Sequence, residues 1–358
     1  MAAETIVVAG GGSGGHLYPG IAIAQELQRR RPELEIVFAA AGSPLERDIL
    51  GRHGYPLLPI ASGGVVGKSF ARRITGGFRA SRGFVQSIGA LRRIRPRMVI
   101  GVGGYASGPM VMAGVLLRLP TLIHEQNYYP GMTNRILAPW VRRVATSFPE
   151  TAAYLGGRGT LTGNPTRSEF VKARRKERGG SFHVLVFGGS QGSRAINDAV
   201  IAALEPLREH RGSFRFVHGT GPAELERVRA AYAASGFDAD VRSYIEGILQ
   251  AYESADLVVA RSGASTMSEI AICGKGSILI PLPKAAHDHQ RFNARKLESA
   301  GAAIVMEEES LTGEALAGTL LSLRDDPARL TRMEDAASSL AIPDAAARIA
   351  DLAEEMVA

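Results

Sequence analysis

Three glycine-rich segments place small and polar residues where a phosphate group could bind. They are residues 10–16 (GGGSGGH), residues 101–105 (GVGGY, followed by ASGP) and residues 188–193 (GGSQGS). Each follows an apolar run, and the first and third open a helical pattern. Glycine lets the backbone approach a ligand closely, and the free N–H groups at a helix start attract anions. We therefore expect two diphosphate groups, one in each half of the chain, rather than three empty strand-to-helix turns.

The first segment also fits the dinucleotide-binding pattern G-x-G-x-x-G, through Gly10, Gly12 and Gly15. That pattern requires an acid near the end of the second strand, where it holds a ribose hydroxyl. Here the second apolar run ends in Phe38 and three alanines, without an acid. This argues against NAD and leaves an NADP-linked oxidoreductase as an alternative function.

Three other patterns resemble functional sites without completing them. Residues 62–69 would form an ATP-binding loop if Ser62 were glycine, and no convincing magnesium-binding strand follows. Asp238 and Asp240 resemble a metal-binding pair, but we expect a turn there, ahead of a strand. The single cysteine, Cys273, lies in an apolar stretch, which excludes a disulfide framework and predicts a small buried residue.

The glycine segments must be positioned by the elements around them. Short apolar runs alternate with longer amphipathic patterns, which predicts parallel sheets covered on both faces. The clearest helical patterns are residues 21–31, 195–210 and 222–235. The expected strands are residues 5–9, 35–39, 98–102, 120–124, 183–187, 214–218, 256–260 and 277–280. Because the alternation restarts at residue 183, we expect two doubly wound α/β domains facing a cleft, with ligands at the carboxyl ends of their strands.

Length and composition are those of a globular protein: 358 residues, 45% hydrophobic and 22% charged. No apolar stretch approaches the roughly 20 residues of a membrane span, and no targeting segment is evident. Residues 1–163 contain 19 Lys and Arg against 8 Asp and Glu, whereas the remainder contains 23 against 27. We expect the basic first half to meet an anionic partner. A turn at residues 163–165, followed by the charged run 172–178, marks the expected domain boundary.

The glycine segments and four further motifs resemble, in order, those of the MurG family, in glycosyltransferase family 28. The seven motifs are GGGSGGHLYPGIAIA, GVGGYASGP, HEQN, GNPTR, GGSQGS, RSGASTMSE and DHQRFNA. The resemblance implies the GT-B fold, with residues 1–163 binding the acceptor and residues 164–342 binding UDP-N-acetylglucosamine (UDP-GlcNAc). It also implies that residues 343–358 form a helix that returns to the first domain.

The reaction implied by the resemblance moves GlcNAc from UDP-GlcNAc to undecaprenyl-pyrophosphoryl-MurNAc-pentapeptide (lipid I). The attacking group is the C4 hydroxyl of MurNAc, and the product, lipid II, is used in peptidoglycan synthesis. A third alternative, besides this transferase and the oxidoreductase, is a non-catalytic protein that binds a sugar nucleotide within a cell-wall complex.

The resemblance also assigns substrate-binding residues. Ser190 is the implied diphosphate contact, Glu269 accepts from the ribose hydroxyls, and the backbone of Ile245 reads the uracil. The implied contacts for the acceptor diphosphate are Gly103, Gly104 and Tyr105. The implied substrate-binding residues are Ser13, Gly14, Gly15, Asn127, Arg167, Ser190, Ile245, Ala264, Ser265, Thr266, Met267, Ser268, Glu269 and Gln290.

An inverting transfer needs a base near the attacking hydroxyl and stabilisation of the departing diphosphate. His16 ends the first glycine segment and suits that base, because the ordinary pKa of histidine is about 6.5. Glu125, in HEQN, is the alternative base or the residue that orients one. His287 and His289 resemble a metal pair, but the resemblance places them in a donor-sugar loop. We therefore predict no metal and no cofactor.

A lipid acceptor and the absence of a membrane span predict a surface that docks on lipid. Residues 68–97 contain nine Lys and Arg and no acid, with apolar residues at helical spacing. We expect two short helices, broken at Gly76 and Gly77, that lie on the anionic inner leaflet. The alternative is an ordinary helix pair with a solvated basic face.

These features predict a peripheral protein on the cytoplasmic side of the cell membrane. No RNA-binding signature accompanies the charge, so we expect no nucleic-acid partner. Other cell-wall synthesis proteins are further candidate partners.

Overall fold

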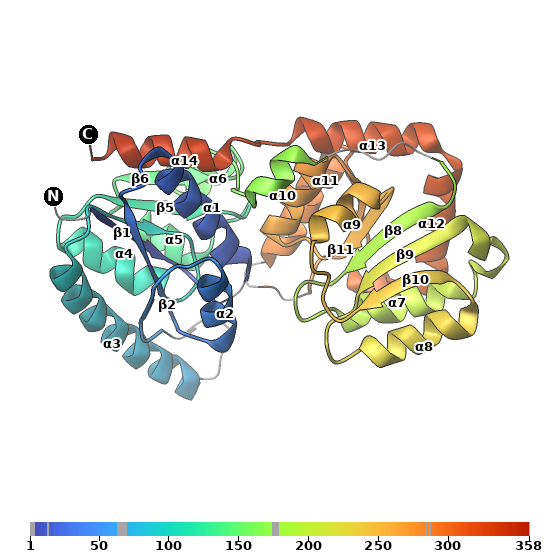
Figure 1. Ribbon diagram of the computed structural model, residues 1–358, viewed down its shortest axis with the longest axis horizontal. Helices are drawn as coiled ribbons and strands as arrows, with labels where there is room; N and C mark the ends of the chain where they lie inside the picture. The colour runs from blue at the N-terminus through green and yellow to red at the C-terminus, as the bar shows by residue number, and fades with distance from the viewer. Residues whose placement is uncertain are drawn as a thin grey trace. The chain divides into compact units, whose positions relative to one another are not determined.

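The computed structural model describes residues 4–12, 14–62, 70–173, 179–283, 285 and 288–357; for residues 70–80 it describes the backbone only. The chain divides into two compact units, shown in Figure 1. Unit 1 is Met1–Arg167 with Ile342–Ala358, and unit 2 is Ser168–Ala341. The chain thus passes from unit 1 to unit 2 after Arg167, a few residues beyond the boundary at 163 that the sequence suggests.

Unit 1 contains one parallel sheet of seven strands, in the order β3-β2-β1-β4-β5-β6-β7. The strands are β1 (Thr5–Ala9), β2 (Glu35–Ala40), β3 (Leu57–Pro59), β4 (Met98–Gly101), β5 (Thr121–Glu125), β6 (Arg143–Thr146) and β7 (Thr160–Leu161). The helices are α1 (Gly14–Arg30), α2 (Pro44–Arg52), α3 (Phe70–Ile94), α4 (Ser107–Leu116), α5 (Met132–Leu137), α6 (Thr151–Tyr154) and α14 (Ala345–Glu355).

Unit 2 contains a parallel sheet of six strands, in the order β10-β9-β8-β11-β12-β13. The strands are β8 (Phe182–Phe187), β9 (Phe214–Gly219), β10 (Asp238–Arg242), β11 (Leu257–Ala260), β12 (Gly276–Leu279) and β13 (Ala303–Val305). The helices are α7 (Arg194–Leu204), α8 (Leu225–Ser235), α9 (Ile248–Ser254), α10 (Ala264–Cys273), α11 (His289–Ser299), α12 (Gly313–Asp325) and α13 (Pro327–Ser339). Short 3-10 helices are η1 (Ser168–Lys172), η2 (Arg208–Ser213) and η4 (Glu308–Ser310).

Each sheet is buried on both faces because its central strands are apolar at nearly every position. In β1, Ile6 and Val8 face a core with α1, α2 and α14, whereas Val7 and Ala9 face a core with α3, α4 and α5. Strand β8 divides in the same way between a core with α7, α8 and α12 and a core with α9, α10 and α11. The predicted α/β class with two doubly wound parallel sheets is confirmed.

All eight expected strands are present, each within one residue of its expected ends. The sequence did not reveal β3, β6, β7, β10 and β13, which lie toward the sheet margins. The turn expected at Asp238 and Asp240 is wrong, because both residues lie on β10. There Asp238 pairs with Arg215 and Asp240 with Arg242, so both carboxylates are committed to surface ion pairs.

The helix break expected at Gly76 and Gly77 is also wrong, because α3 is a single helix over Phe70–Ile94. A helical glycine costs only about 1 kcal/mol relative to alanine, so tertiary packing can override it. That packing lies in the second half of the helix. Leu91 is buried, and Gly83 passes so close to Ala61 that a Cβ there would lie 2.0 Å from the Ala61 carbonyl oxygen.

Helix α14 completes the core of unit 1 by packing against α1. Ile349 and Ala353 are fully buried there. Arg30 at the end of α1 bridges the two helices, with its Nη1 2.6 Å from Asp351 and 2.8 Å from Glu354. In the described part of the chain, no helix is long and apolar enough to cross a membrane.

We predict that Ile349→Ala lowers the free energy of unfolding by about 3 kcal/mol, because it leaves a cavity between α14 and the sheet. Urea unfolding followed by circular dichroism measures this change. Arg348→Ala, on the exposed side of the same helix, is the control and should cost less than about 1 kcal/mol. Equal effects of the two substitutions would show that α14 is not part of the core.

Candidate functional site

The first two glycine segments meet at the centre of the unit 1 sheet. Strands β1 and β4 are hydrogen-bonded neighbours, and the strand order runs outward in both directions from this pair. In doubly wound sheets, ligands bind beyond the carboxyl ends of such a pair. A Cβ at Gly104 would lie 2.1 Å from the carbonyl oxygen of Gly11, so the two loops are in backbone contact. Tyr105, next along the second loop, is 56% exposed.

His16 lies in the first turn of α1, against the second glycine loop. A Cβ at Gly103 would lie 2.8 Å from His16 Nδ1 and 3.4 Å from Gln126 Oε1. Only glycine at position 103 leaves room for the imidazole in this place. Ser13, which precedes α1, lies outside the described residues, whereas Gly14 and Gly15 form the start of the helix.

Glu46 is a residue of this site that the sequence analysis missed. Its carboxylate is fully buried and accepts from Gly12 N–H at 2.7 Å and from Ser43 N–H at 2.7 Å. The same side chain completes a capping box at the start of α2. The S-x-x-E pattern of residues 43–46 is the signal that could have revealed it. Because Gly12 N–H already has an anionic partner, a bound phosphate would have to use other donors of the loop.

A buried polar cluster lies beside His16. His124 is fully buried; its Nε2 lies 3.0 Å from the Gly163 carbonyl oxygen. Gln126 donates to the Val102 carbonyl oxygen at 2.7 Å and lies 3.4 Å from His124 Nδ1. Burial lowers the pKa of His124 to about 4, so this imidazole is neutral at pH 7. Neither His124 nor Gln126 was predicted from the sequence to have a role, although both belong to the HEQN motif.

Glu125 is buried, and its carboxylate organises the loop after β5. It accepts from Asn127 N–H at 3.0 Å, Asn127 Nδ2 at 3.1 Å, Gly131 N–H at 2.9 Å and Asn134 Nδ2 at 2.8 Å. Four donors match the roughly four acceptor sites of a carboxylate. The structure therefore places Glu125 as the anchor that fixes the position of Asn127.

The GNPTR motif lies at the end of unit 1, where the chain leaves it. The Arg167 guanidinium is 5.2 Å from the centre of the Tyr18 ring, a cation–π contact with α1. Asn164 is only 4% exposed, and neither of its amide atoms has a hydrogen-bond partner among the described residues. The charged run expected to mark a linker lies mostly at residues 174–178, outside the described residues.

Unit 2 repeats this arrangement with different residues. Strands β8 and β11 are the neighbours from which its strand order runs outward, and the third glycine segment follows β8. A Cβ at Gly192 would lie 2.0 Å from the Thr220 carbonyl oxygen, so this loop packs directly on the loop after β9. Ser190 is exposed at the tip of the glycine loop, and Ser193 caps α7 by accepting from Ile196 N–H.

The segment from Ala264 to Glu269 begins α10, directly after the neighbouring strand β11. Its N-cap is Gly263, which has no side chain and so makes no side-chain cap hydrogen bond itself. Ser265, Thr266 and Ser268 are half-buried, whereas Met267 is 2% exposed and anchors the segment in the core. Glu269 accepts from Tyr252 O–H at 3.2 Å.

Gln290 lies in the first turn of α11, close to the residues that precede α10. Its backbone carbonyl accepts from Ser262 O–H at 2.8 Å, and its side-chain Oε1 accepts from Leu282 N–H at 3.0 Å. Ile245, in the loop after β10, is 5% exposed and packs in the unit 2 core. Its side chain is therefore committed to the core, and its backbone is the part able to contact a ligand.

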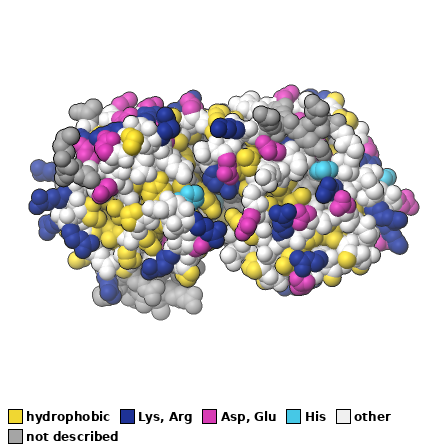
Figure 2. All heavy atoms as spheres, in the orientation of Figure 1, with side chains coloured by type: hydrophobic (Ala, Val, Ile, Leu, Met, Phe, Trp, Pro, Cys, Tyr) yellow, Lys and Arg dark blue, Asp and Glu magenta, His cyan; other side chains and the backbone are white. Residues whose placement is uncertain are grey.

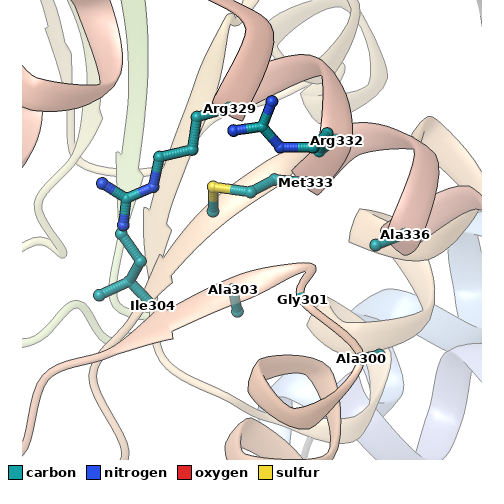
Figure 3. A pocket seen from close by; sticks show the side chains of 8 residues that line it. All are labelled: Ala300, Gly301, Ala303, Ile304, Arg329, Arg332, Met333 and Ala336. Atoms are coloured by element: carbon teal, nitrogen blue, oxygen red, sulfur yellow. The ribbon is translucent and has the colours of Figure 1, made fainter. Parts of the chain in front are cut away.

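Two other features of the described residues lie apart from these loops. No group of three or more His, Cys, Asp or Glu there could hold a metal ion, and His287 of the expected metal pair lies outside the description. Figure 3 shows an open pocket of about 500 Å³ between α13 and β13, with Arg329 and Arg332 along one side. It reaches Ala303 at the amino end of β13, the opposite end of the sheet from the glycine loop and the start of α10.

Comparison with known families assigns the whole arrangement. Residues 6–146 match the Glycosyltransferase family 28 N-terminal domain, and residues 183–349 match the Glycosyltransferase family 28 C-terminal domain. The chain belongs to glycosyltransferase family 28. Within this family, a protein of Geobacter sulfurreducens is 44% identical over 359 residues, covering 99% of this chain and 98% of the relative. One of Myxococcus xanthus is 44% identical over 355 residues, covering 98% and 93%.

Both relatives are named UDP-N-acetylglucosamine--N-acetylmuramyl-(pentapeptide) pyrophosphoryl-undecaprenol N-acetylglucosamine transferase. Among solved structures, Acinetobacter baumannii MurG is similar with a TM-score of 0.79 at 28% identity, covering 98% of this chain and 99% of that one. The kitacinnamycin glycosyltransferase shares the fold, with a TM-score of 0.75 at 17% identity over 100% of both chains. The expected family and GT-B fold are confirmed for this family-28 chain.

We predict that Gly104→Ala destabilises unit 1 much more than Gly12→Ala. Both glycines have positive φ, 81° and 90°, so both substitutions strain the backbone by about 1–2 kcal/mol. Only the Cβ at position 104 meets the Gly11 backbone, whereas at position 12 no atom lies within 4 Å. Thermal unfolding of the two variants measures the difference. Equal melting temperatures would show that the two loops are not in contact.

Stability should decrease in acid because two histidines are buried in the neutral form. Burial lowers the pKa of His124 to about 4 and that of His218 to about 3. The unfolded chain binds these protons near pH 6.5, so the contribution of the two neutral histidines to the free energy of unfolding is complete above that pH. It falls by about 1.4 kcal/mol per pH unit and histidine as the pH drops toward the folded-state pKa. Urea unfolding between pH 7 and pH 4.5 measures this slope.

The matched variants are His124→Gln and His218→Gln, each of which should flatten the pH profile. His53→Gln is the control, because His53 is exposed. A His124→Gln profile parallel to that of the original chain would contradict the assignment.

Proposed function

We propose that this chain transfers GlcNAc from UDP-GlcNAc to the C4 hydroxyl of MurNAc in lipid I, forming lipid II for peptidoglycan synthesis. The observation that carries the proposal is 44% identity, over nearly the full length of both chains, to transferases named for this reaction. The geometry agrees, because both sheets carry a glycine loop at the carboxyl end where doubly wound folds bind ligands.

We assign the donor to unit 2. The start of α10, where Gly263 is the N-cap, is the proposed site for the sugar nucleotide, and Glu269 in the same helix is the proposed acceptor for the ribose hydroxyls. Ser190 and the third glycine loop supply donors for the diphosphate, so they stabilise the charge on the leaving UDP. Gln290, fixed by Leu282 N–H, and Asn127 of unit 1, fixed by Glu125, are the proposed contacts for the donor sugar. Arg167 is the proposed cationic contact.

We assign the acceptor to unit 1, with the second glycine loop and Tyr105 near its diphosphate. Of the two candidate bases, His16 fits better than Glu125. Glu125 already accepts four hydrogen bonds and cannot take a proton without losing at least one of them. His16 Nδ1 is buried against Gly103, so Nε2 is the nitrogen we propose takes the proton of the C4 hydroxyl. Attack of that oxygen on the anomeric carbon then expels UDP with inversion.

Turnover tests this function directly. Release of UDP from UDP-GlcNAc should depend on a lipid I analogue, and the product should contain a GlcNAc–MurNAc disaccharide. Binding of UDP-GlcNAc without turnover would favour the non-catalytic alternative. Binding of NADP with its characteristic absorbance would favour the oxidoreductase.

His16→Ala should lower kcat by about 10²-fold or more, the scale of a lost general base. The affinity for UDP-GlcNAc should barely change, because His16 is not among the proposed contacts of the donor. Steady-state kinetics with calorimetry of UDP-GlcNAc binding measures both quantities. A kcat near that of the original enzyme would exclude His16 as the base.

We further propose that α3 docks unit 1 on the anionic cytoplasmic leaflet. Figure 2 shows Lys and Arg side chains along the margin of the unit where Figure 1 places α3. Arg82, Arg92 and Arg93 are exposed there, and the segment contains no acid. However, Phe84, Ile88 and Leu91 pack into the unit 1 core, so this part of the apolar stripe is unavailable to lipid. Over residues 81–94 the attraction must therefore be mainly electrostatic.

Changing Arg72, Arg73, Arg79 and Arg82 together to Gln should abolish binding to anionic vesicles. Each arginine near an anionic surface contributes about 1 kcal/mol, and salt screens this attraction. Vesicle sedimentation at low and high salt measures it. Activity on a soluble, short-chain lipid I analogue should survive. Unchanged vesicle binding would place the docking surface elsewhere.

A further inference from the structure

A chain of buried polar side chains lies behind the third glycine loop, and the proposed reaction uses none of them. Its members are Asn197 on α7, His218 on β9 and Tyr232 on α8, which are 0%, 0% and 2% exposed. Burying such groups without partners would cost several kcal/mol. Their mutual hydrogen bonds therefore determine how each side chain is oriented.

Each side chain in the series donates to the next, from Tyr232 through His218 and Asn197 to the Thr220 carbonyl oxygen. Asn197 Nδ2 donates to the Thr220 carbonyl oxygen at 3.0 Å, which leaves Asn197 Oδ1 as an acceptor 3.0 Å from His218 Nε2. His218 must therefore carry its proton on Nε2, so its Nδ1 accepts from Tyr232 O–H at 3.2 Å. Only the neutral imidazole both donates and accepts in this way. Reversing the amide of Asn197 would direct its oxygen at the Thr220 carbonyl.

This series of hydrogen-bonded side chains ends at the backbone that supports the third glycine loop. The Thr220 carbonyl that Asn197 holds is the group that a Cβ at Gly192 would strike at 2.0 Å. Asn197 also belongs to the first turn of α7, where its N–H donates to the Ser193 carbonyl oxygen at 2.9 Å. The network thus joins both neighbours of the glycine loop, the start of α7 and the loop after β9.

We propose that His218 and Tyr232 are positioning residues for the donor diphosphate. Neither touches the substrate. They orient Asn197, which fixes the Thr220 carbonyl and thereby the backbone N–H groups of the glycine loop that receive the phosphates. The inference rests on the proposed function, since it takes the glycine loop of unit 2 as the diphosphate site.

Tyr232→Phe removes the end of the chain and keeps the ring in the core. We expect the Kd for UDP to rise about fivefold, the scale of one lost hydrogen bond, while the Kd for uridine stays unchanged. His218→Leu removes two hydrogen bonds and should raise the Kd for UDP at least as much. Calorimetry measures UDP binding, and competition against UDP measures uridine binding.

Val228→Ala is the control, because Val228 is fully buried on the same helix and makes no hydrogen bond through its side chain. It should lower the melting temperature without changing the ratio of the two Kd values. UDP binding at the original affinity in both variants would overturn the proposal, and so would equal weakening of UDP and uridine. Failure of the original chain to bind UDP would instead contradict the proposed function.

Discussion

Both candidate sites depend on backbone packed directly against backbone at the carboxyl ends of neighbouring parallel strands. In unit 1 the second glycine loop lies against Gly11, and in unit 2 the third lies against Thr220. A side chain at Gly104 or Gly192 would have to overlap a carbonyl oxygen at about 2 Å. This close packing leaves no space for side chains that could shield the loop N–H groups. It is the constraint from which the placement of His16, Ser190 and their neighbours follows.

Such loops have little side-chain packing of their own, and hydrogen bonds from buried polar side chains stabilise them. Glu46 holds the first loop through Gly12 N–H, and Glu125 holds the loop that carries Asn127. In unit 2 the support comes from Asn197 and His218. Each of these groups is almost fully buried and hydrogen-bonded, so replacing one leaves its partners unsatisfied in a low-dielectric interior. The same burial lowers the pKa of His124 and of His218.

Helix α14, which comes from the end of the sequence, completes the core of unit 1. After α13 the chain returns, and Ile349 and Ala353 fill the face of α1 that would otherwise be exposed apolar surface. Arg30 then joins two carboxylates of the returning helix. Unit 1 is therefore built from both ends of the sequence, and its core cannot be complete until residue 357 has been made.

The sequence by itself determined the α/β class, the two sheets, the eight central strands and the family, because these depend on local signals. Buried parallel strands are continuously apolar, and glycine segments at strand ends can be read without knowing what surrounds them. The tertiary structure alone decided the contacts that join distant segments. Glu46 meets Gly12 and Asn197 meets Thr220 only because the strand order brings their loops together. It also decided that α3 is continuous across Gly76 and Gly77, because packing of residues 83–91 outweighs a local glycine penalty of about 1 kcal/mol per residue.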